Sequence, residues 1–326
     1  MQDLEFRQFV ERLKLRAPIE EVVRERVPEL KKRGALWQAR CPFHDERTPS
    51  FTVDPRRGTW HCWGACSEGG DVIGFLERFE GVGFMDALRI LAQSTGEQMP
   101  ERLLERRRRG GESKIEERYD VLRRAERLYR KAFLAEEGAE ARAYVADRGL
   151  SPETLELFGV GWAPREGSPL LAAARDAKVR PELLVETGLV KRADDGRAYD
   201  FFRGRLMIPI RDRMGRTVGF GGRVLPADEA RGDGRPQAKY VNTPETALFL
   251  KGRLIFGLDL AIADVRRSKH LVLVEGYTDV MALHQAGCRS AAAVLGTATT
   301  SDHAALVRRS GAKRVTLLFD GDEAGR

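Results

Sequence analysis

Two short pairs of metal-ligand residues lie close together in the first quarter of the chain. Two residues separate Cys41 from His44, three separate Cys62 from Cys66, and seventeen separate the two pairs. Two loops that each offer two thiolate or imidazole ligands can surround one tetrahedral Zn²⁺ ion. We therefore predict a closed, structural zinc site made of these four residues, with His61 pointing away from it. Ordinary buried cysteines are the alternative interpretation.

Acidic residues form a second group near the end of the chain. Glu275 follows one apolar, strand-like segment, and Asp320 and Asp322 follow another. Ligands of open α/β sheets bind at the carboxyl ends of the strands, so we expect these carboxylates to meet in one crevice. Asp279, in the first turn of the next helix, is expected to face the same crevice. Oxygen ligands favour Mg²⁺ or Mn²⁺, and turn aspartates without a metal are the alternative.

Aromatic and basic side chains accompany the cysteine pairs. Flat rings on which bases stack, together with cations that meet phosphates, are typical of surfaces that bind single-stranded DNA. The sequence therefore indicates such a surface on the zinc-binding region, unless the rings pack its small core instead. Its candidate members are Arg40, Phe43, Arg56, Arg57, Trp60 and Trp63.

The region around the cysteine pairs is predicted to be a small module, and a charged segment follows it. Residues 1–103 are expected to form a zinc-ribbon-like domain that ends in two amphipathic helices, the first of them capped by Asp71. Residues 104–113 have two glycines among charged side chains and little apolar surface to bury. That composition predicts a flexible linker.

The rest of the chain is predicted to contain a mixed region and a parallel sheet. Residues 114–262 combine helical periodicity with a hairpin near residue 210, where Pro209 favours an edge or a bulge. In residues 263–326 strands and helices alternate in the order βαβαβ, which predicts a parallel α/β sheet. The predicted fold class is therefore a multidomain chain with α+β and α/β parts.

Composition narrows the class of protein. The 326 residues are 42% hydrophobic with a mean hydropathy of −0.40, as expected for globular domains. The formal charge of +7 suits a nucleic-acid partner but does not require one. No apolar run approaches the roughly 18 residues that span a bilayer, and the acidic N-terminus is unlike a signal peptide. We expect a cytoplasmic protein without disulfides and without a membrane partner.

Several blocks of the sequence resemble the bacterial DnaG-type DNA primases, in the order of that family and over nearly the whole chain. Blocks similar to its zinc domain are Cys41-Pro-Phe-His44, Thr48-Pro-Ser-Phe51, His61-Cys62 and Gly69-Gly70-Asp71. Blocks similar to its RNA-polymerase core are Arg203-Gly-Arg205, Ile208-Pro-Ile210, Gly219-Phe-Gly-Gly-Arg223, Lys239-Tyr-Val-Asn-Thr-Pro-Glu-Thr246 and Lys251-Gly-Arg253. Blocks similar to its Toprim segment are Val274-Glu-Gly-Tyr-Thr-Asp279, Leu295-Gly-Thr-Ala-Thr-Thr300 and Asp320-Gly-Asp-Glu-Ala-Gly-Arg326.

The resemblance implies an activity and a metal site. The activity is template-directed synthesis of short RNA primers on single-stranded DNA for DNA replication, from ribonucleoside triphosphates, by metal-assisted nucleotidyl transfer. Glu275, Asp320 and Asp322 match the acidic Toprim positions and would hold Mg²⁺ or Mn²⁺ during catalysis, with Asp279 beside them.

The resemblance also implies contacts with nucleic acid and with a partner. Lys239 and Lys251 match basic catalytic positions that contact nucleotide phosphates or the template. Arg205, Arg223 and Asn242 lie in matching blocks and are expected to contact the strand or the nucleotide. A replicative helicase is implied as a partner through a C-terminal region absent from these residues, and we expect a monomer.

Two features depart from the family pattern. Ala65 looks like a one-residue insertion between Cys62 and Cys66, which leaves the turn at Cys66 open. The sequence also stops at Arg326, before a further acidic element of the family. We therefore expect weak Mg²⁺ binding, an incompletely covered Toprim sheet and poor or absent primer synthesis by these residues alone.

Three other classes of protein fit part of the pattern. A Toprim nuclease or topoisomerase-type enzyme shares the acidic residues but needs a nucleophile, and Tyr240 and Tyr277 have no context that suggests this role. A phage-type primase–helicase needs a P-loop, and the sequence contains none. A non-catalytic DNA-binding fragment is the third alternative.

Overall fold

The chain is described by a computed structural model that covers residues 2–44, 46–100, 113–193, 195–229, 237–296 and 299–319. It divides into two compact units, an N-terminal unit of residues 1–111 with 308–311 and a C-terminal unit of residues 112–307 with 312–326. In the described ranges, no helix combines the length and the apolar character needed to cross a membrane.

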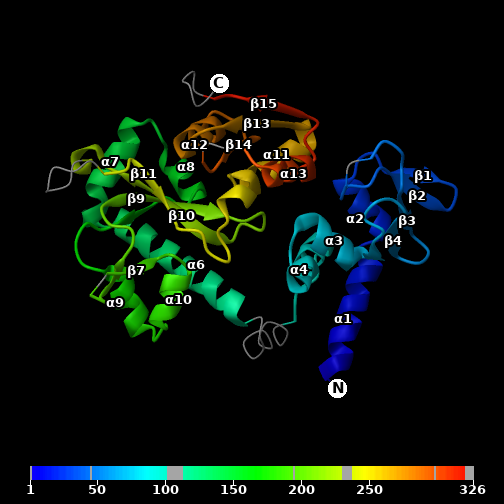
Figure 1. Ribbon diagram of the computed structural model, residues 1–326, viewed down its shortest axis with the longest axis horizontal. Coiled ribbons are helices and arrows are strands. Elements are labelled where there is room, and N and C mark those ends of the chain that lie inside the picture. The colour runs from blue at the N-terminus through cyan, green and yellow to red at the C-terminus, as the bar shows by residue number, and fades with distance from the viewer. Residues whose placement is uncertain are drawn as a thin grey trace. The chain divides into compact units, whose positions relative to one another are not determined.

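The N-terminal unit combines helices with a five-stranded antiparallel sheet (Figure 1). The strands lie in chain order across the sheet, so each strand pairs with the next one in the sequence. The described helices are α1 (Gln2–Arg16), α2 (Ile19–Arg26), α3 (Val72–Glu80) and α4 (Phe84–Thr95). The strands are β1 (Lys31–Arg33), β2 (Leu36–Ala39), β3 (Phe51–Asp54), β4 (Thr59–Cys62) and β5 (Gly69–Asp71).

The central strands of this sheet have one buried face. Phe51 and Val53 of β3 are buried, as are Trp60 and Cys62 of β4, and the residues between them are less so. Phe51 pairs with Cys62, and Val53 pairs with Trp60. Since side chains alternate along a strand, these four residues share a face, and that face supplies one wall of the core.

An aromatic cluster fills the core between the sheet and α3. The rings of Phe51 and Trp60 are stacked with their centroids 5.4 Å apart, and Phe75 of α3 lies 6.1 Å from Phe51. Phe43 lies 5.2 Å from Trp60, so the loop that carries it is packed onto the same cluster. The loop after β2 is therefore anchored by its aromatic residue.

Both predicted helices after Gly70 are confirmed as α3 and α4. Asp71 caps α3, since its Oδ1 accepts hydrogen bonds from the amides of Ile73 (3.0 Å) and Gly74 (2.9 Å). Gly81 ends α3 in the left-handed conformation, with a φ of 68°.

The C-terminal unit contains two four-stranded sheets, in the orders β11-β10-β9-β6 and β12-β14-β13-β15, and a two-stranded ribbon, β7-β8 (Figure 1). Its described strands are β6 (Gly161–Ala163), β7 (Val190–Arg192), β8 (Ala198–Asp200), β9 (Arg205–Arg211), β10 (Thr217–Val224), β11 (Tyr240–Asn242), β12 (Ile255–Phe256), β13 (His270–Val274), β14 (Ala291–Val294) and β15 (Arg314–Leu317). Its described α-helices are α6 (Ser113–Leu134), α7 (Ala139–Asp147), α8 (Pro152–Leu157), α9 (Pro169–Asp176), α10 (Pro181–Glu186), α11 (Leu258–Ser268), α12 (Tyr277–Gln285) and α13 (Ser301–Arg309). Its described 3₁₀ turns are η2 (Glu136–Gly138), η3 (Pro226–Asp228) and η4 (Lys251–Arg253).

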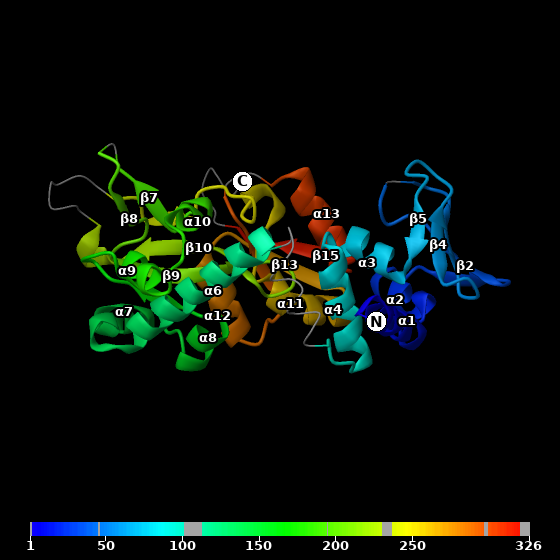
Figure 2. The same ribbon diagram turned by 90° about the horizontal axis from the view of Figure 1, so that it is seen from below.

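The predicted hairpin is formed by β9 and β10, at the centre of the first sheet. β6 pairs with β9 only as far as Met207, so β10 is the strand that pairs with Pro209 in the described part of the chain. A register shift between Thr217 and Gly219 follows near the turn. The first strand is therefore neither an edge strand nor bulged at Pro209, because the extra residue lies in β10. Pro209 is tolerated because β6 ends before it, so its missing N–H faces no second strand among the described residues. Helix α6 packs against β6 and β10 of this sheet (Figure 2).

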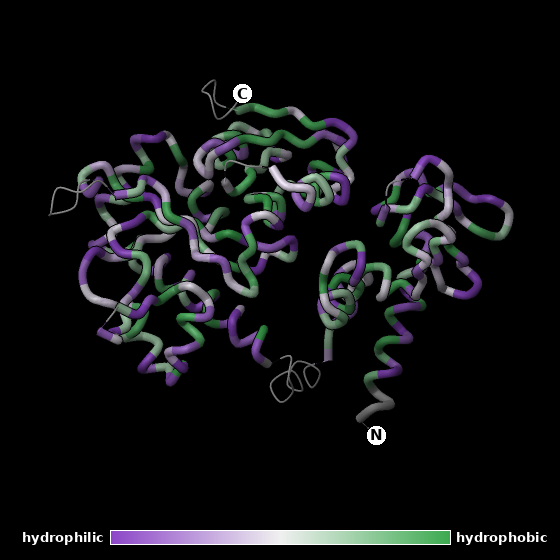
Figure 3. The backbone as a smooth tube through the Cα atoms, viewed as in Figure 1, coloured by the Kyte–Doolittle hydropathy of each residue, from purple (hydrophilic) through white to green (hydrophobic). Residues whose placement is uncertain are grey.

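The predicted βαβαβ segment is confirmed in the second sheet. β13 lies between β14 and β15 and is parallel to both. The antiparallel strand β12 was not predicted, because two residues are too few to show a period. β15 alternates polar and apolar residues (Figure 3), and its apolar residues Val315 and Leu317 are exposed, Leu317 to 61%.

The predicted combination of α+β and α/β parts is confirmed, but the predicted domain boundaries stay predictions. The expected linker, residues 104–113, lies outside the described residues except for Ser113, where α6 begins. The expected boundary between residues 262 and 263 falls inside α11.

Candidate functional site

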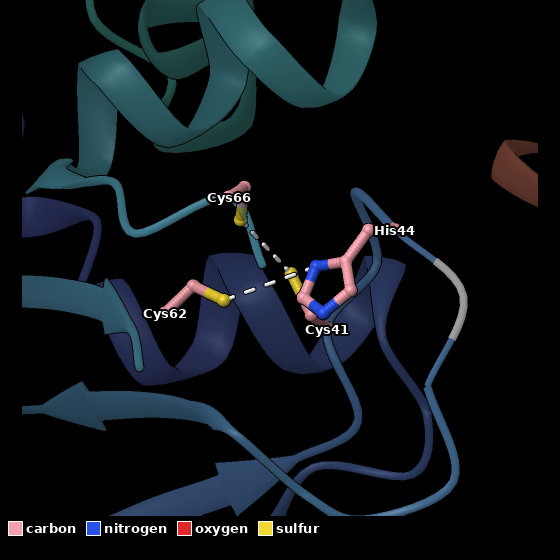
Figure 4. A group of neighbouring side chains, drawn as sticks. All are labelled: Cys41, His44, Cys62 and Cys66. Atoms are coloured by element: carbon pink, nitrogen blue, oxygen red, sulfur yellow. Dashed lines mark hydrogen bonds between the residues drawn. The ribbon is translucent and has the colours of Figure 1, made fainter. Parts of the chain in front are cut away.

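The four predicted zinc ligands meet in the N-terminal unit. Cys41 and His44 follow β2, Cys62 ends β4, and Cys66 lies in the loop before β5. Their ligand atoms lie within 4.8 Å of one another; Cys41 Sγ is 3.6 Å from Cys66 Sγ, and Cys62 Sγ is 3.9 Å from His44 Nδ1 (Figure 4). A tetrahedron with zinc–ligand bonds of about 2.0 to 2.3 Å has edges of about 3.3 to 3.8 Å. The four residues therefore fit one Zn²⁺ ion, with His44 binding through Nδ1.

The contacts around Cys62 favour its thiolate. Cys62 Sγ lies 3.4 Å from Ser50 Oγ and accepts a hydrogen bond from the amide of Gly64 at 3.3 Å. Burial opposes ionisation, but the contacts with Ser50, Cys66 and Gly64 lower the pKa of Cys62 to about 7. Burial raises the pKa of the Cys41 and Cys66 thiols. Cys62 is therefore the thiol that most readily offers a cation its charged form.

A carboxylate that the sequence analysis missed holds the imidazole of His44. Glu46 Oε2 lies 3.1 Å from His44 Nε2, and Glu46 Oε1 accepts hydrogen bonds from the amides of Cys41 (2.6 Å) and Ser50 (3.1 Å). An ionised carboxylate only accepts, so Nε2 carries the proton and Nδ1 is left for the metal. The available signal was a glutamate two residues after a ligand histidine.

A turn absorbs the extra residue in the second cysteine pair. The amide of Ser67 donates to the carbonyl of Gly64 at 3.1 Å, and Ser67 has a φ of 47°, in the left-handed region. Gly64 lies tightly against the site, since a Cβ there would be 2.9 Å from His44 Nε2. Cys66 thus reaches the other ligands with Ala65 in the loop.

The structure contradicts a base-stacking role for Trp60. Trp60 is 4% exposed and packs in the aromatic core, because alternate residues of β4 face inward. Trp63 is 74% exposed, lies 4.3 Å from the ring of His61, and donates from Nε1 to Thr52 Oγ1 at 3.1 Å. Arg56 is exposed between β3 and β4, as a phosphate contact requires. The exposed ring of this surface is therefore that of Trp63.

Glu275 and Asp279 occupy the predicted strand end of the C-terminal unit. Glu275 directly follows β13 and is exposed, and Asp279 is exposed in the first turn of α12. The Asp279 carboxylate lies over Gly276, where a Cβ would be 2.5 Å from Oδ2. Asp320 and Asp322 lie outside the described residues, so their convergence with Glu275 stays a prediction.

Arg205 braces the sheet, contrary to its predicted contact with a strand or nucleotide. Its side chain is buried, and its Nη1 donates to the carbonyls of Gly222 (3.1 Å) and Ala238 (3.0 Å). Its Nη2 lies 3.4 Å from Gln237 Oε1. A guanidinium that already bonds the backbone in the interior is not available to a phosphate, so Arg205 ties β9 and β10 to the chain before β11.

Arg223 is also buried, but one of its donors is unused. Its Nε donates to the hydroxyl of Tyr144 at 3.1 Å, its Nη2 pairs with Glu229 at 3.4 Å, and its guanidinium faces the ring of Tyr240. Its Nη1 is buried and has no hydrogen-bond partner among the described residues. An unpaired buried donor is costly, so an anion that reached Nη1 would be favoured there.

Asn242 joins β11 of the first sheet to helix α12 through Tyr277. Tyr277 OH donates to Asn242 Oδ1 at 2.7 Å, and its ring lies against Gly221, where a Cβ would be 2.8 Å from the ring. Only a glycine leaves room for this approach. Tyr277 is 7% exposed and its hydroxyl is bonded, which disfavours the role of nucleophile that a topoisomerase-type enzyme requires.

The two predicted lysines differ in their surroundings. Lys239 is exposed just before β11, and Lys251 is half-buried in η4. A buried histidine that the sequence analysis left without a role fixes the backbone of η4: His303 Nε2 lies 3.0 Å from the carbonyl of Lys251, and Thr300 N donates to His303 Nδ1 at 3.1 Å. Its partner is 52 residues away in the chain, so no local spacing revealed the contact.

Three family models match the chain. The CHC2 zinc finger matches residues 6–107, the N-terminal domain of the DNA primase catalytic core matches residues 128–262, and the Toprim domain matches residues 269–326. The zinc-finger match and the ligand geometry confirm the predicted zinc cofactor and its zinc-ribbon-like module.

Curated relatives are similar over most of this chain. The DNA primase of Deinococcus radiodurans is 45% identical over 286 residues, which are 87% of this chain and 47% of that protein. The DNA primase of Haemophilus influenzae is 39% identical over 325 residues, 98% of this chain and 52% of that protein. The chain thus spans about half the length of the curated relatives it matches.

Solved structures match as well. The zinc-binding and RNA polymerase domains of the Aquifex aeolicus primase match with a TM-score of 0.59 and 34% identity, over 98% of this chain and 73% of that chain. A DnaG primase catalytic domain bound to single-stranded DNA matches with a TM-score of 0.57 and 39% identity, over 65% of this chain and 63% of that chain. With zinc-finger, catalytic-core and Toprim segments in this order, the chain belongs to the DnaG-type DNA primase family.

Proposed function

We propose that the protein is a DNA primase that binds single-stranded DNA and synthesises short RNA primers on it from ribonucleoside triphosphates. Membership of the DnaG-type family supports the proposal, as does the match to a family member bound to single-stranded DNA. A topoisomerase-type enzyme with Tyr277 as its nucleophile is disfavoured because Tyr277 is buried and bonded.

The observation that carries the proposal is the contact between α12 and the β10–β11 pair. Glu275 lies two residues before Tyr277, and Arg223 lies two residues after Gly221. The packing of Tyr277 on Gly221 and its bond to Asn242 therefore support a site in which the acidic strand end lies near the basic one. Nucleotidyl transfer needs both kinds of group, because a divalent cation must be held and phosphate charge must be offset.

In the proposed reaction the 3′-hydroxyl of the primer attacks the α-phosphorus of the incoming nucleotide, and pyrophosphate leaves as the new P–O bond forms. A divalent cation held by Glu275, with Asp279, Asp320 and Asp322 as further candidate ligands, would supply Lewis-acid stabilisation of the hydroxyl and of the leaving group. Lys239 is exposed and free to meet phosphate oxygens.

The remaining predicted roles form the second part of the proposal. Arg223 offers its unused Nη1 donor to a phosphate, and Lys251 is held in place through its backbone by His303. In the N-terminal unit, the exposed Trp63 and Arg56 would contact the bases and phosphates of the template. A replicative helicase partner, a cytoplasmic location and a monomeric state complete the proposal as expectations of the family resemblance.

Primer synthesis with labelled ribonucleotides on single-stranded DNA tests the proposal. Glu275→Gln in the full-length protein should abolish RNA synthesis while single-stranded DNA binding stays within about twofold, because the change removes a charge at the cation site and leaves the basic groups intact. Glu136→Gln, an exposed change in η2, is the matched control and should keep full activity. Unchanged synthesis by Glu275→Gln would overturn the assignment.

A further inference from the structure

A cleft of about 580 Å³ in the C-terminal unit has no role in the primer-synthesis site described above. It is bounded by the second half of α6, the segment that follows α8, and the end of β9. Cationic side chains dominate its lining, which includes two glutamates, Glu126 and Glu156. The cations are Arg123, Arg127, Arg130, Lys131 and Arg211.

Three of the cationic side chains form a row along one face of α6. Arg123, Arg127 and Lys131 are four residues apart, so they share a face of the helix and follow one another at intervals of about 6 Å. All three are exposed. The side chains of Arg127 and Lys131 have neither an ion pair nor a hydrogen bond among the described residues, whereas Arg123 pairs with Asp120. The guanidinium of Arg127 and the ammonium of Lys131, at the opening of the cleft, are therefore free to bind an anion.

The back wall of the cleft is held rigidly. Arg211 Nη2 lies 2.9 Å from Glu126 Oε1, and its Nη1 donates to the carbonyl of Leu157 at 3.2 Å. Gly159 makes this pair possible, since a Cβ there would be 2.6 Å from both Arg211 Nη2 and Glu126 Oε1. Arg130 donates to the carbonyl of Val160 at 3.0 Å. Because Arg211 offsets the charge of Glu126, the exposed cations dominate the field in the cleft.

The cleft lies at the opposite end of the hairpin from the basic end of the primer-synthesis site. Arg211 ends β9, whereas Arg205 begins it and pairs in register with Val224, the neighbour of Arg223. Six steps along a strand span about 20 Å. Among the described residues, no aromatic side chain lines the cleft, so it offers charge to phosphates without a platform on which bases could stack.

We propose that this cleft binds the phosphate backbone of single-stranded DNA at a distance from the primer-synthesis site, independently of base sequence. The proposal rests on the proposed function, which brings a single-stranded template to the other end of the same hairpin. A strand long enough to pass both ends would meet the free Arg127 and Lys131, and each phosphate contact would release counterions. An acidic protein segment is the competing occupant.

Fluorescence anisotropy with the full-length protein tests the proposed DNA site. It measures the binding of two oligodeoxythymidylates, of about 6 and about 25 nucleotides, at several salt concentrations. Arg127→Gln combined with Lys131→Gln should weaken binding of the long oligomer about tenfold and lower its salt slope by about 1.4, from two lost contacts of about 0.7 each. Binding of the short oligomer should not change. Arg175→Gln combined with Lys178→Gln, which removes two exposed cations elsewhere in the same unit, is the control.

The outcomes separate this proposal from the proposed function. Equal losses in the cleft variant and the control would overturn the cleft, because they would report general charge alone. A long-oligomer loss confined to the cleft variant supports the cleft, even if Glu275→Gln keeps primer synthesis and the proposed function fails. An acidic peptide whose binding needs Arg127 and Lys131, with DNA binding unchanged, would overturn the cleft as a DNA site. Unchanged thermal melting of the double variant would show that its fold is intact.

Discussion

The zinc site and the acidic strand end differ in how their residues are held. In the N-terminal unit, Cys41, His44, Cys62 and Cys66 lie within a span of 26 residues and already meet. In the C-terminal unit, the expected site residues come from distant elements, and each is held by a different partner or left exposed. A closed structural site is complete in the chain itself, whereas an open site leaves groups unused until a substrate or cation arrives.

Burial shows the same contrast among the arginines of the C-terminal unit. Arg205 is buried with its donors bonded to the backbone, whereas Arg127 is exposed and has no partner among the described residues. Arg223 lies between these cases, buried with one unused donor. A basic residue type therefore does not reveal whether the side chain serves the fold or a ligand.

The largest effect is expected at the closed site. Cys62→Ser should lose the zinc ion and unfold the N-terminal unit, because metal binding supplies roughly 10 kcal/mol or more of folding free energy in such modules. Elemental analysis and limited proteolysis would show zinc loss and cleavage confined to that unit. Cys288→Ser, at a cysteine outside the zinc group, should change neither. A folded, zinc-loaded Cys62→Ser variant would break the comparison.

Glu46→Gln should weaken zinc binding by about 10- to 100-fold without unfolding the zinc-loaded protein. The side-chain amide of Gln has a single acceptor oxygen, so it cannot accept hydrogen bonds from both the backbone amides and His44 Nε2. Its NH₂ group would then face one of these N–H donors. Competition with a chromophoric chelator measures the affinity. Glu29→Gln, at an exposed carboxylate that pairs with Arg40, is the matched control, and equal affinities in both variants would remove Glu46 from the site.

Asp71→Ala should destabilise the N-terminal unit by about 1 kcal/mol through loss of the α3 cap. Burial opposes it, but the Gly74 amide, the Lys14 ammonium and the Ile73 amide lower the pKa of Asp71 below its ordinary value. The wild-type contribution is therefore fully present above the unfolded pKa of about 3.9 and is lost as the pH falls through the lower folded pKa. Denaturant unfolding at two pH values would show the difference between wild type and variant shrinking in acid; a constant difference would contradict the cap.

The smallest expected effect compares two buried tyrosines of the C-terminal unit. Tyr277→Phe should cost about 1 kcal/mol, because it leaves Asn242 without its donor. Tyr129→Phe should be neutral or stabilising, since the Tyr129 hydroxyl is buried without a hydrogen-bond partner among the described residues. Thermal unfolding of the two variants side by side measures the contrast. A larger loss from Tyr129→Phe would show that the joint at Tyr277 does not organise this unit.

The sequence alone was sufficient where the signal is local. Two ligand pairs at short spacing predicted the zinc site, Asp71 before an apolar period predicted α3, and alternating strands and helices predicted the parallel sheet of β13, β14 and β15. Each depends on residues close in the chain, whose geometry is set by backbone periodicity and by loops too short to vary widely.

Tertiary structure alone decided which polar and aromatic residues face inward and which distant residues meet. Trp60 and Trp63 are three residues apart and of the same type, yet the pairing of β4 buries the first and leaves the second exposed. Asn242 and Tyr277 are 35 residues apart, and their bond depends on helix α12 packing onto β10 at a glycine. Burial and long-range contacts follow from how helices and strands pack against one another. Residue types at local spacing do not predict that packing.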